Sequence, residues 1–359
     1  LLAYVRKVRE RIESSLTPSL SPLHKGGEGA GSGGIQYHRP LMLVLVNSVN
    51  TEDADLELFF RELEQIGCQG IKEDDWRTAK DELWQELGQS PTFLFENEPI
   101  RVDYTLWSSL VPEDICRYVF NADGWGEIEV LIRPSNRQEM AFKLKTADRP
   151  FALIKIGDIS GWLKEKLSGY AIAERFDDES LFARLNADDS DINILMGSRS
   201  FYEGWDSNRP NVICYINIGT GTDAQKFILQ SVGRGVRIEP IKNKRKRLLP
   251  LYNAGEVEQS LFQQIGDAVQ PLETLFIFGT NRSALQTVLE NLQKERTTGQ
   301  WRTLDVFEVN PEAEKVCLLI PVYKPASAPR AQQKLIAKFE IAQDELDALR
   351  AFVQGTDDR

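Results

Sequence analysis

The sequence has 359 residues, of which 42% are hydrophobic and 27% charged, and its formal net charge is −11. This composition is typical of a globular chain long enough for two domains, and no apolar run is long enough to cross a membrane. The four cysteines form no C-x-x-C pair, which argues against a zinc ribbon or a disulfide framework and favours a reducing, cytoplasmic compartment. His24 and His38 lie in polar sequence, so we expect neither a histidine-based catalytic dyad nor a metal site.

The first 34 residues predict a truncated helix and a linker. Residues 1–15 are amphipathic and begin without a start methionine or a signal-peptide pattern, so we expect the native polypeptide to begin earlier. Residues 16–34 contain two prolines and six glycines, which suits a flexible linker. The string TPSLSPLHKGGEG also resembles translated short repeats of some prokaryotic genomes, so an ordinary linker and an insertion into the gene remain equal alternatives.

Residues 35–300 predict one α/β domain. Residues 41–46 (LMLVLV) are apolar throughout, as in a buried strand, and residues 56–66 repeat apolar side chains at helical spacing before Gly67. Residues 70–150 do not continue a simple alternation of strand and helix. Segments of strand length, separated by turn-forming residues, predict a β-rich insertion there, with strands at 127–132, 139–145 and 151–156.

Two further strands are predicted at residues 191–197 (DINILMG) and 212–218 (VICYINI), joined by a polar turn. In that turn Glu203 and Asp206 supply carboxylates, and Gly204 permits close approach of the backbone. Ligands of open α/β sheets bind outside the carboxyl ends of the strands. We therefore expect the turn at that edge, where a carboxylate could hold a ribose hydroxyl or position water.

A helix is predicted over residues 227–237. It places three polar side chains at i, i+4 and i+7 on one face: Gln230, Arg234 and Arg237. A guanidinium keeps its proton and offers a planar fork of donors, which suits the charge that develops on a transferred phosphoryl group. Salt bridges of an ordinary surface are the alternative. Gly233 and Gly235 each cost a helix about 1 kcal/mol, so we expect another surface to approach them closely.

A basic segment follows this helix. Between Arg234 and Arg247 there are seven basic residues against one acidic residue, Glu239, a local charge of +6. Such an excess can contact a nucleic-acid backbone, here through Lys242, Lys244, Arg245, Lys246 and Arg247. A solvated loop is the alternative. No aromatic residues are interleaved for stacking on bases, so base-specific recognition is not indicated.

The order of strand, Gly-x-Asp turn, strand and Q-x-x-x-R-x-x-R helix resembles motifs V and VI of superfamily-two helicases. The strings FYEGWD and QSVGRGVRIEP are similar to the form found in the restriction subunit of type III restriction enzymes. The resemblance implies a second RecA-like motor domain in which Gly204 and Asp206 line the nucleotide pocket, with Glu203 beside them. It also implies that three residues face the phosphates bound by the other domain: Gln230, Arg234 and Arg237.

The other half of such a motor is missing from the sequence. No G-x-x-x-x-G-K-[ST] string occurs, so we find no phosphate-binding loop. The acidic runs 73–75 and 113–114 do not follow a buried apolar strand, and we expect them to be solvated charge. After Trp301 we find no convincing set of nuclease metal ligands.

We therefore expect a fragment of an ATP-dependent type III restriction endonuclease that alone neither hydrolyses ATP nor cuts DNA. ATP and Mg²⁺ would be bound chiefly by the first RecA-like domain, and the other partners would be double-stranded DNA and a methyltransferase (Mod) subunit. Residues 301–359 predict a strand and a helix that lead toward a nuclease domain. Two alternatives remain: a non-catalytic remnant that binds DNA or a partner, and the equivalent domain of another superfamily-two translocase.

Overall fold

The computed structural model describes residues 1–16, 35–46, 55–89, 100–134, 136–157, 159–174, 180–198, 206–219, 221–281 and 285–290. All of them belong to one compact unit, residues 1–296. The predicted linker up to residue 34 and the strand and helix predicted after residue 301 lie outside the described residues.

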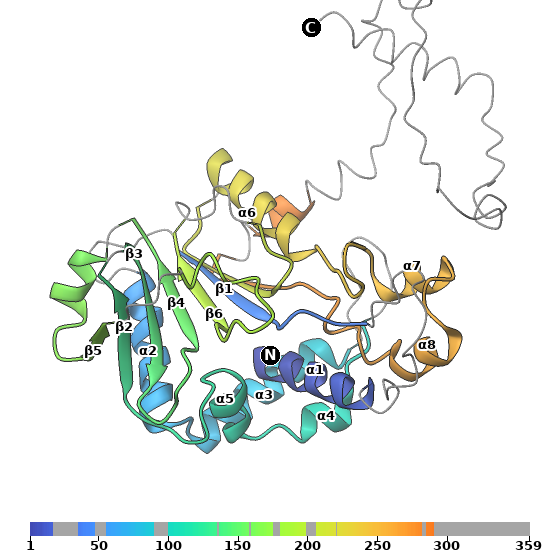
Figure 1. The fold of residues 1–359 in the computed structure, drawn as a ribbon, viewed down its shortest axis with the longest axis horizontal. Helices are drawn as coiled ribbons and strands as arrows, with labels where there is room; N and C mark the ends of the chain where they lie inside the picture. The colour runs from blue at the N-terminus through green and yellow to red at the C-terminus, as the bar shows by residue number, and fades with distance from the viewer. Residues whose placement is uncertain are drawn as a thin grey trace, which may run out of the picture. The chain divides into compact units, whose positions relative to one another are not determined.

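A mixed sheet of eight strands forms the centre of the described chain (Figure 1). The strand order is β5-β2-β3-β4-β6-β1-β7-β8, and every pair is parallel except the two that β3 forms. The strands are β1 (Leu41–Val46), β2 (Ile128–Arg133), β3 (Asn136–Leu144), β4 (Ala152–Lys155), β5 (Ala171–Glu174), β6 (Ile194–Gly197), β7 (Pro210–Ile216) and β8 (Phe276–Gly279). The predicted α/β class with a mainly parallel sheet is confirmed, and this architecture is compatible with a RecA-like domain.

The predicted strand β1 lies between β6 and β7, with Leu43 opposite Leu195 on one side and Ile213 on the other. Its side chains alternate between two cores: Val44 and Val46 enter one face, and the leucines enter the other. Because both faces of the strand are covered, its sequence is apolar throughout and does not alternate.

Helices cover both faces of the sheet (Figure 1). On one face α2 (Asp55–Gln69) buries Leu56 and Phe60, and Phe60 lies 4.6 Å from the ring of Phe142 in β3. On the opposite face α6 (Thr222–Gly235) buries Phe227 and Ile228. This apolar face of α6 fixes which side chains of the helix remain available to solvent.

A third core lies beside the sheet and joins segments from distant parts of the sequence. Its helices are α1 (Leu2–Leu16), α3 (Glu73–Leu87), α4 (Tyr104–Ser108), α7 (Leu248–Asn253) and α8 (Gln259–Ile265). Tyr4 of α1 packs edge-on against Trp107 of α4, with ring centroids 5.2 Å apart. The helix predicted at the start of the chain is therefore confirmed.

The three strands predicted within the insertion are present in the structure. They extend the central sheet and do not form a separate element. β4 pairs with β6 in parallel, and β3 and β2 continue the sheet beyond β4. The sequence pattern of a strand reports its burial and not its neighbours, which explains why the pattern suggested a separate β-rich element.

One acidic run differs from the prediction of solvated charge. Glu73 to Asp75 are exposed in the first turn of α3, as expected. Asp114, in α5 (Pro112–Tyr118), is only 8% exposed. Its carboxylate accepts from the Val111 backbone N–H at 3.1 Å and lies 2.8 Å from Nζ of Lys7. The prediction is wrong for Asp114 because its carboxylate caps α5 and pairs with α1 at the same time.

None of the helices within the described ranges is both long and apolar enough to cross a membrane.

Candidate functional site

Asp206 is the last residue of the Gly-x-Asp turn, and the structure describes it. It lies at the amino edge of the sheet. Because β6 and β7 are parallel, the segment between them returns from the carboxyl end of β6 to the amino end of β7. Asp206 lies four residues before β7 begins, and its carbonyl accepts a hydrogen bond of 2.5 Å from Nδ2 of Asn186. The prediction of a site at the carboxyl edge is therefore wrong for Asp206. Glu203 and Gly204 lie outside the described residues.

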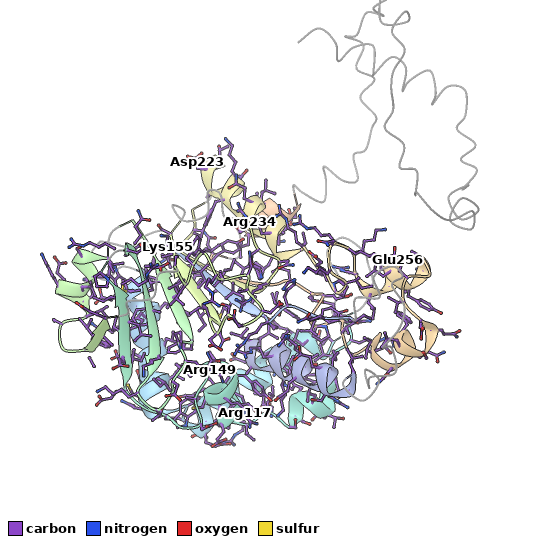
Figure 2. All side chains as sticks on the ribbon, in the orientation of Figure 1. Arg117, Arg149, Lys155, Asp223, Arg234 and Glu256 are labelled. Atoms are coloured by element: carbon purple, nitrogen blue, oxygen red, sulfur yellow. The ribbon has the colours of Figure 1, made fainter. Side chains whose placement is uncertain are left out.

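The arginines lie at the end of α6 that is closest to Asp206. Figure 2 labels Asp223 near the beginning of α6 and Arg234 near its end. Gln230 is exposed and Arg234 is half-buried. Arg237 lies two residues beyond the helix, and its N–H donates to the Arg234 carbonyl at 3.1 Å in a tighter turn. The single helical face predicted for these residues therefore ends before Arg237.

A shared carboxylate brings the turn and the arginine segment together. Nη1 of Arg237 donates to Oδ1 of Asp206, and Nη2 of Arg245 lies 3.8 Å from Oδ2 of the same carboxylate. Nε of Arg245 lies 3.9 Å from Oε2 of Glu239. The Asp206 side chain is 58% exposed and that of Arg237 is 37% exposed, so each pair contributes at most about 1 kcal/mol. An incoming phosphate can therefore compete for these guanidinium groups at small cost.

Polar groups behind this cluster hold the basic segment against the start of β7. Nδ2 of Asn208 contacts Nε2 of His38 and lies 3.4 Å from Oε2 of Glu239. The backbone N–H of Asn243 donates to the other oxygen of Glu239. Burial lowers the pKa of His38, which favours the neutral ring at this position.

Arg209 was missed by sequence reasoning, although it fixes the chain next to Asp206. It is 2% exposed, and its guanidinium donates to three backbone carbonyls: Arg39 at 2.9 Å, Ile192 at 2.7 Å, and Leu185. Burial lowers the pKa of Arg209 to about 9, so the group is still charged at neutral pH. Its neighbours in the sequence give no signal that would separate it from a surface arginine.

The two glycines near the end of α6 have different surroundings. A Cβ placed on Gly235 would lie 2.5 Å from Cδ1 of Leu275, so the predicted close approach is confirmed there. A Cβ on Gly233 would meet no heavy atom within 4 Å among the described residues. No described residue approaches Gly233 closely, so the prediction is not confirmed there.

This difference predicts opposite effects of alanine at the two positions. Gly235→Ala should lower the free energy of unfolding by about 1–3 kcal/mol, because Leu275 must move. Gly233→Ala should leave it unchanged or raise it by up to about 1 kcal/mol, because alanine favours the helix. Urea denaturation of the two variants measures both effects. A larger loss for Gly233→Ala would contradict the packing described here.

The predicted DNA-binding residues fall into two groups. Lys244 pairs with Glu256, Arg245 lies near Asp206 and Glu239, and Arg247 is half-buried at the beginning of α7. The side chains of two further lysines are exposed and make no ion pair with another described residue: Lys242 and Lys246. These two lysines are therefore the best placed to meet a phosphate backbone.

Among the described residues, no group of three or more His, Cys, Asp or Glu side chains could hold a metal ion. The arginines around Asp206 are suited to phosphate, which accepts hydrogen bonds from a guanidinium fork.

No family model, no curated protein and no solved structure matches the chain.

Proposed function

We propose that this chain supplies the arginine-finger half of a DNA-dependent ATPase, as the second RecA-like motor domain of a type III restriction subunit. The observation that carries the proposal is the ion pair between Asp206 and Arg237. It joins two segments that resemble helicase motifs V and VI but are 31 residues apart in the chain. The resemblance of both segments to these motifs is what favours a shared site over an ordinary surface salt bridge.

In this proposal Arg237 changes partner when a nucleotide arrives. The exposed pair with Asp206 is worth at most about 1 kcal/mol, whereas a charge-assisted hydrogen bond to a phosphate is worth about 1.5–3 kcal/mol. The guanidinium therefore moves to the phosphate, and Asp206 stays beside Arg245. ATP and Mg²⁺ would be held chiefly by the first RecA-like domain, where the ion neutralises phosphate charge.

The test is to mix this chain with a separately produced first motor domain and to measure ATP hydrolysis with and without double-stranded DNA. The proposal requires activity that neither part has alone, because the phosphate-binding loop and the finger lie on different domains. Circular dichroism of both parts must show folded protein. An inert mixture of two folded parts would contradict the proposal.

DNA binding is expected to depend on Lys242 and Lys246, which form no ion pair with another described residue. The double variant Lys242→Ala/Lys246→Ala should bind double-stranded DNA more weakly, and the slope of log K against log salt should fall by about 2. The control is Lys72→Ala/Arg77→Ala, which removes two exposed cations at the beginning of the acidic helix α3, where Arg77 pairs with Asp74. Fluorescence anisotropy at several salt concentrations measures both slopes. An equal fall of the slope in the control would show that DNA binding depends on net charge and not on the position of the two lysines.

The same lysines support a second candidate function, which is DNA or partner binding without catalysis. In the structure Arg237 is occupied by Asp206, while Lys242 and Lys246 are exposed. Salt-dependent DNA binding together with an inert mixture in the ATPase assay would favour this candidate. A methyltransferase subunit as a further partner follows only from the type III resemblance.

A further inference from the structure

A cavity lined by described residues shares no residue with the Asp206 cluster. Its volume is about 460 Å³, and it lies between α1, residues 101–106 and residues 264–271. Cavities of about 300–1,000 Å³ are the usual size of small-molecule sites. The three segments around it are well separated in the sequence, so only the folded chain forms the cavity.

The floor of the cavity is apolar and firmly held. Tyr4, Val8 and Ile12 line it from α1, and Ile265 lines it from α8. All four are at most 3% exposed. The Tyr4 hydroxyl accepts a hydrogen bond of 3.1 Å from the backbone N–H of Asp103. Above this buried floor, the half-buried side chains of Val102 and Leu106 give the apolar surface that a ligand can reach.

The rim of the cavity carries two ion pairs. Nη1 of Arg11 lies 2.8 Å from Oδ2 of Asp103, and Nη1 of Arg101 lies 2.6 Å from Oδ2 of Asp267. Both arginine side chains are more than 60% exposed. Pairs as exposed as these rearrange at a cost of at most about 1 kcal/mol.

Hydrogen-bond donors outnumber the acceptors at this rim. Oδ1 of Asp103 already accepts from the N–H groups of Thr105 and Leu106, at 2.8 and 3.2 Å, and its Oδ2 accepts from Arg11. A guanidinium has five N–H donors, and each rim arginine uses only one nitrogen for its carboxylate. A ligand that complements the rim must therefore bring acceptor atoms.

We propose that this cavity binds small organic anions that have an aromatic or otherwise apolar body. The body rests against Val102 and Leu106, and a carboxylate, sulfonate or phosphate group accepts from Arg11 and Arg101. A neutral ligand of the same shape would use the same apolar residues and leave the guanidinium donors to water. The proposal is independent of the ATPase function, because it uses none of the same residues.

The test uses 8-anilinonaphthalene-1-sulfonate, a probe with an aromatic body and one sulfonate, in fluorescence titrations of the full chain. We expect saturable binding at one site. The uncharged analogue N-phenyl-1-naphthylamine should bind more weakly by more than about tenfold, since it loses the contacts to both arginines. Arg11→Met and Arg101→Met should each weaken binding of the sulfonate by about tenfold and leave binding of the neutral probe unchanged.

Two further substitutions test the location. Ala268 lines the cavity from an exposed position, so Ala268→Trp should fill its mouth without disturbing the core and should remove the saturable signal. The matched controls are Ala254→Trp and Arg77→Met, both exposed and outside the cavity, and both should bind like the unaltered chain. No saturable binding by the folded chain, or full binding by Ala268→Trp, would overturn the site. Equal binding of the two probes would overturn the requirement for an anion.

Discussion

Replacing Arg237 by alanine is expected to lower the DNA-stimulated ATPase activity of the reconstituted motor by about 10³-fold or more. An arginine finger acts on charge that develops only in the transition state, so the loss should fall on kcat more than on KM. The free energy of unfolding should hardly change, because the Arg237 side chain is 37% exposed and its ion pair with Asp206 is weak. Steady-state ATPase assays at saturating DNA measure the effect.

Three further variants separate the finger from a general charge effect. Arg237→Lys keeps the charge but loses the planar fork, and we expect it to recover only a small part of the activity. Arg77→Ala removes an exposed arginine of α3 and should leave the activity unchanged. Under the role proposed for both arginines, Arg234→Ala should also lower kcat. Activity of Arg237→Ala within a few-fold of the unaltered chain would rule out the finger.

Replacing the buried Arg209 by methionine is expected to lower the free energy of unfolding by about 3 kcal/mol or more. Methionine keeps much of the length of the side chain, but the three carbonyls that accept from the guanidinium lose their donor. Each buried acceptor left without a partner costs about 1–3 kcal/mol. Relief from burying the charge offsets part of this loss, but three unsatisfied carbonyls outweigh it.

Urea denaturation followed by circular dichroism measures the effect of Arg209→Met. Arg149→Met is the matched control, because that side chain is 59% exposed and, among the described residues, pairs only with Asp191 at 3.2 Å. We expect the control to lose less than about 1 kcal/mol. A similar loss of unfolding free energy in both variants would mean that the three hydrogen bonds of Arg209 stabilise the fold no more than an exposed ion pair does.

The strands that lie at the centre of the sheet could be predicted from sequence because they are buried on both faces. The apolar segments around Leu43, Leu195 and Ile213 are short and uninterrupted, which is typical of parallel strands in a covered sheet. Their order in the sheet could not be predicted in this way. The pairing of β4 with β6 depends on contacts between distant segments, and nothing in the pattern of either strand specifies the other.

The residues of the candidate site were proposed from the sequence, but their position in the fold could not be. The spacing of Gln230, Arg234 and Arg237 indicated a phosphate-facing segment, but α6 ends at Gly235. The general rule for open sheets indicated the carboxyl edge, whereas Asp206 lies at the amino edge because its segment crosses over before β7. Arg209 could not be found at all, since its acceptors are backbone carbonyls, which have no sequence signature.

The central claim is that Asp206 and Arg237 form one half of a shared nucleotide site. The most direct measurement is the affinity of this chain for the first motor domain loaded with ADP and aluminium fluoride, compared with ADP alone. A transition-state analogue should tighten the association by about 10²-fold or more, and Arg237→Ala should abolish the difference. Equal affinities for the two nucleotide states, or the same difference in Arg237→Ala, would contradict the claim.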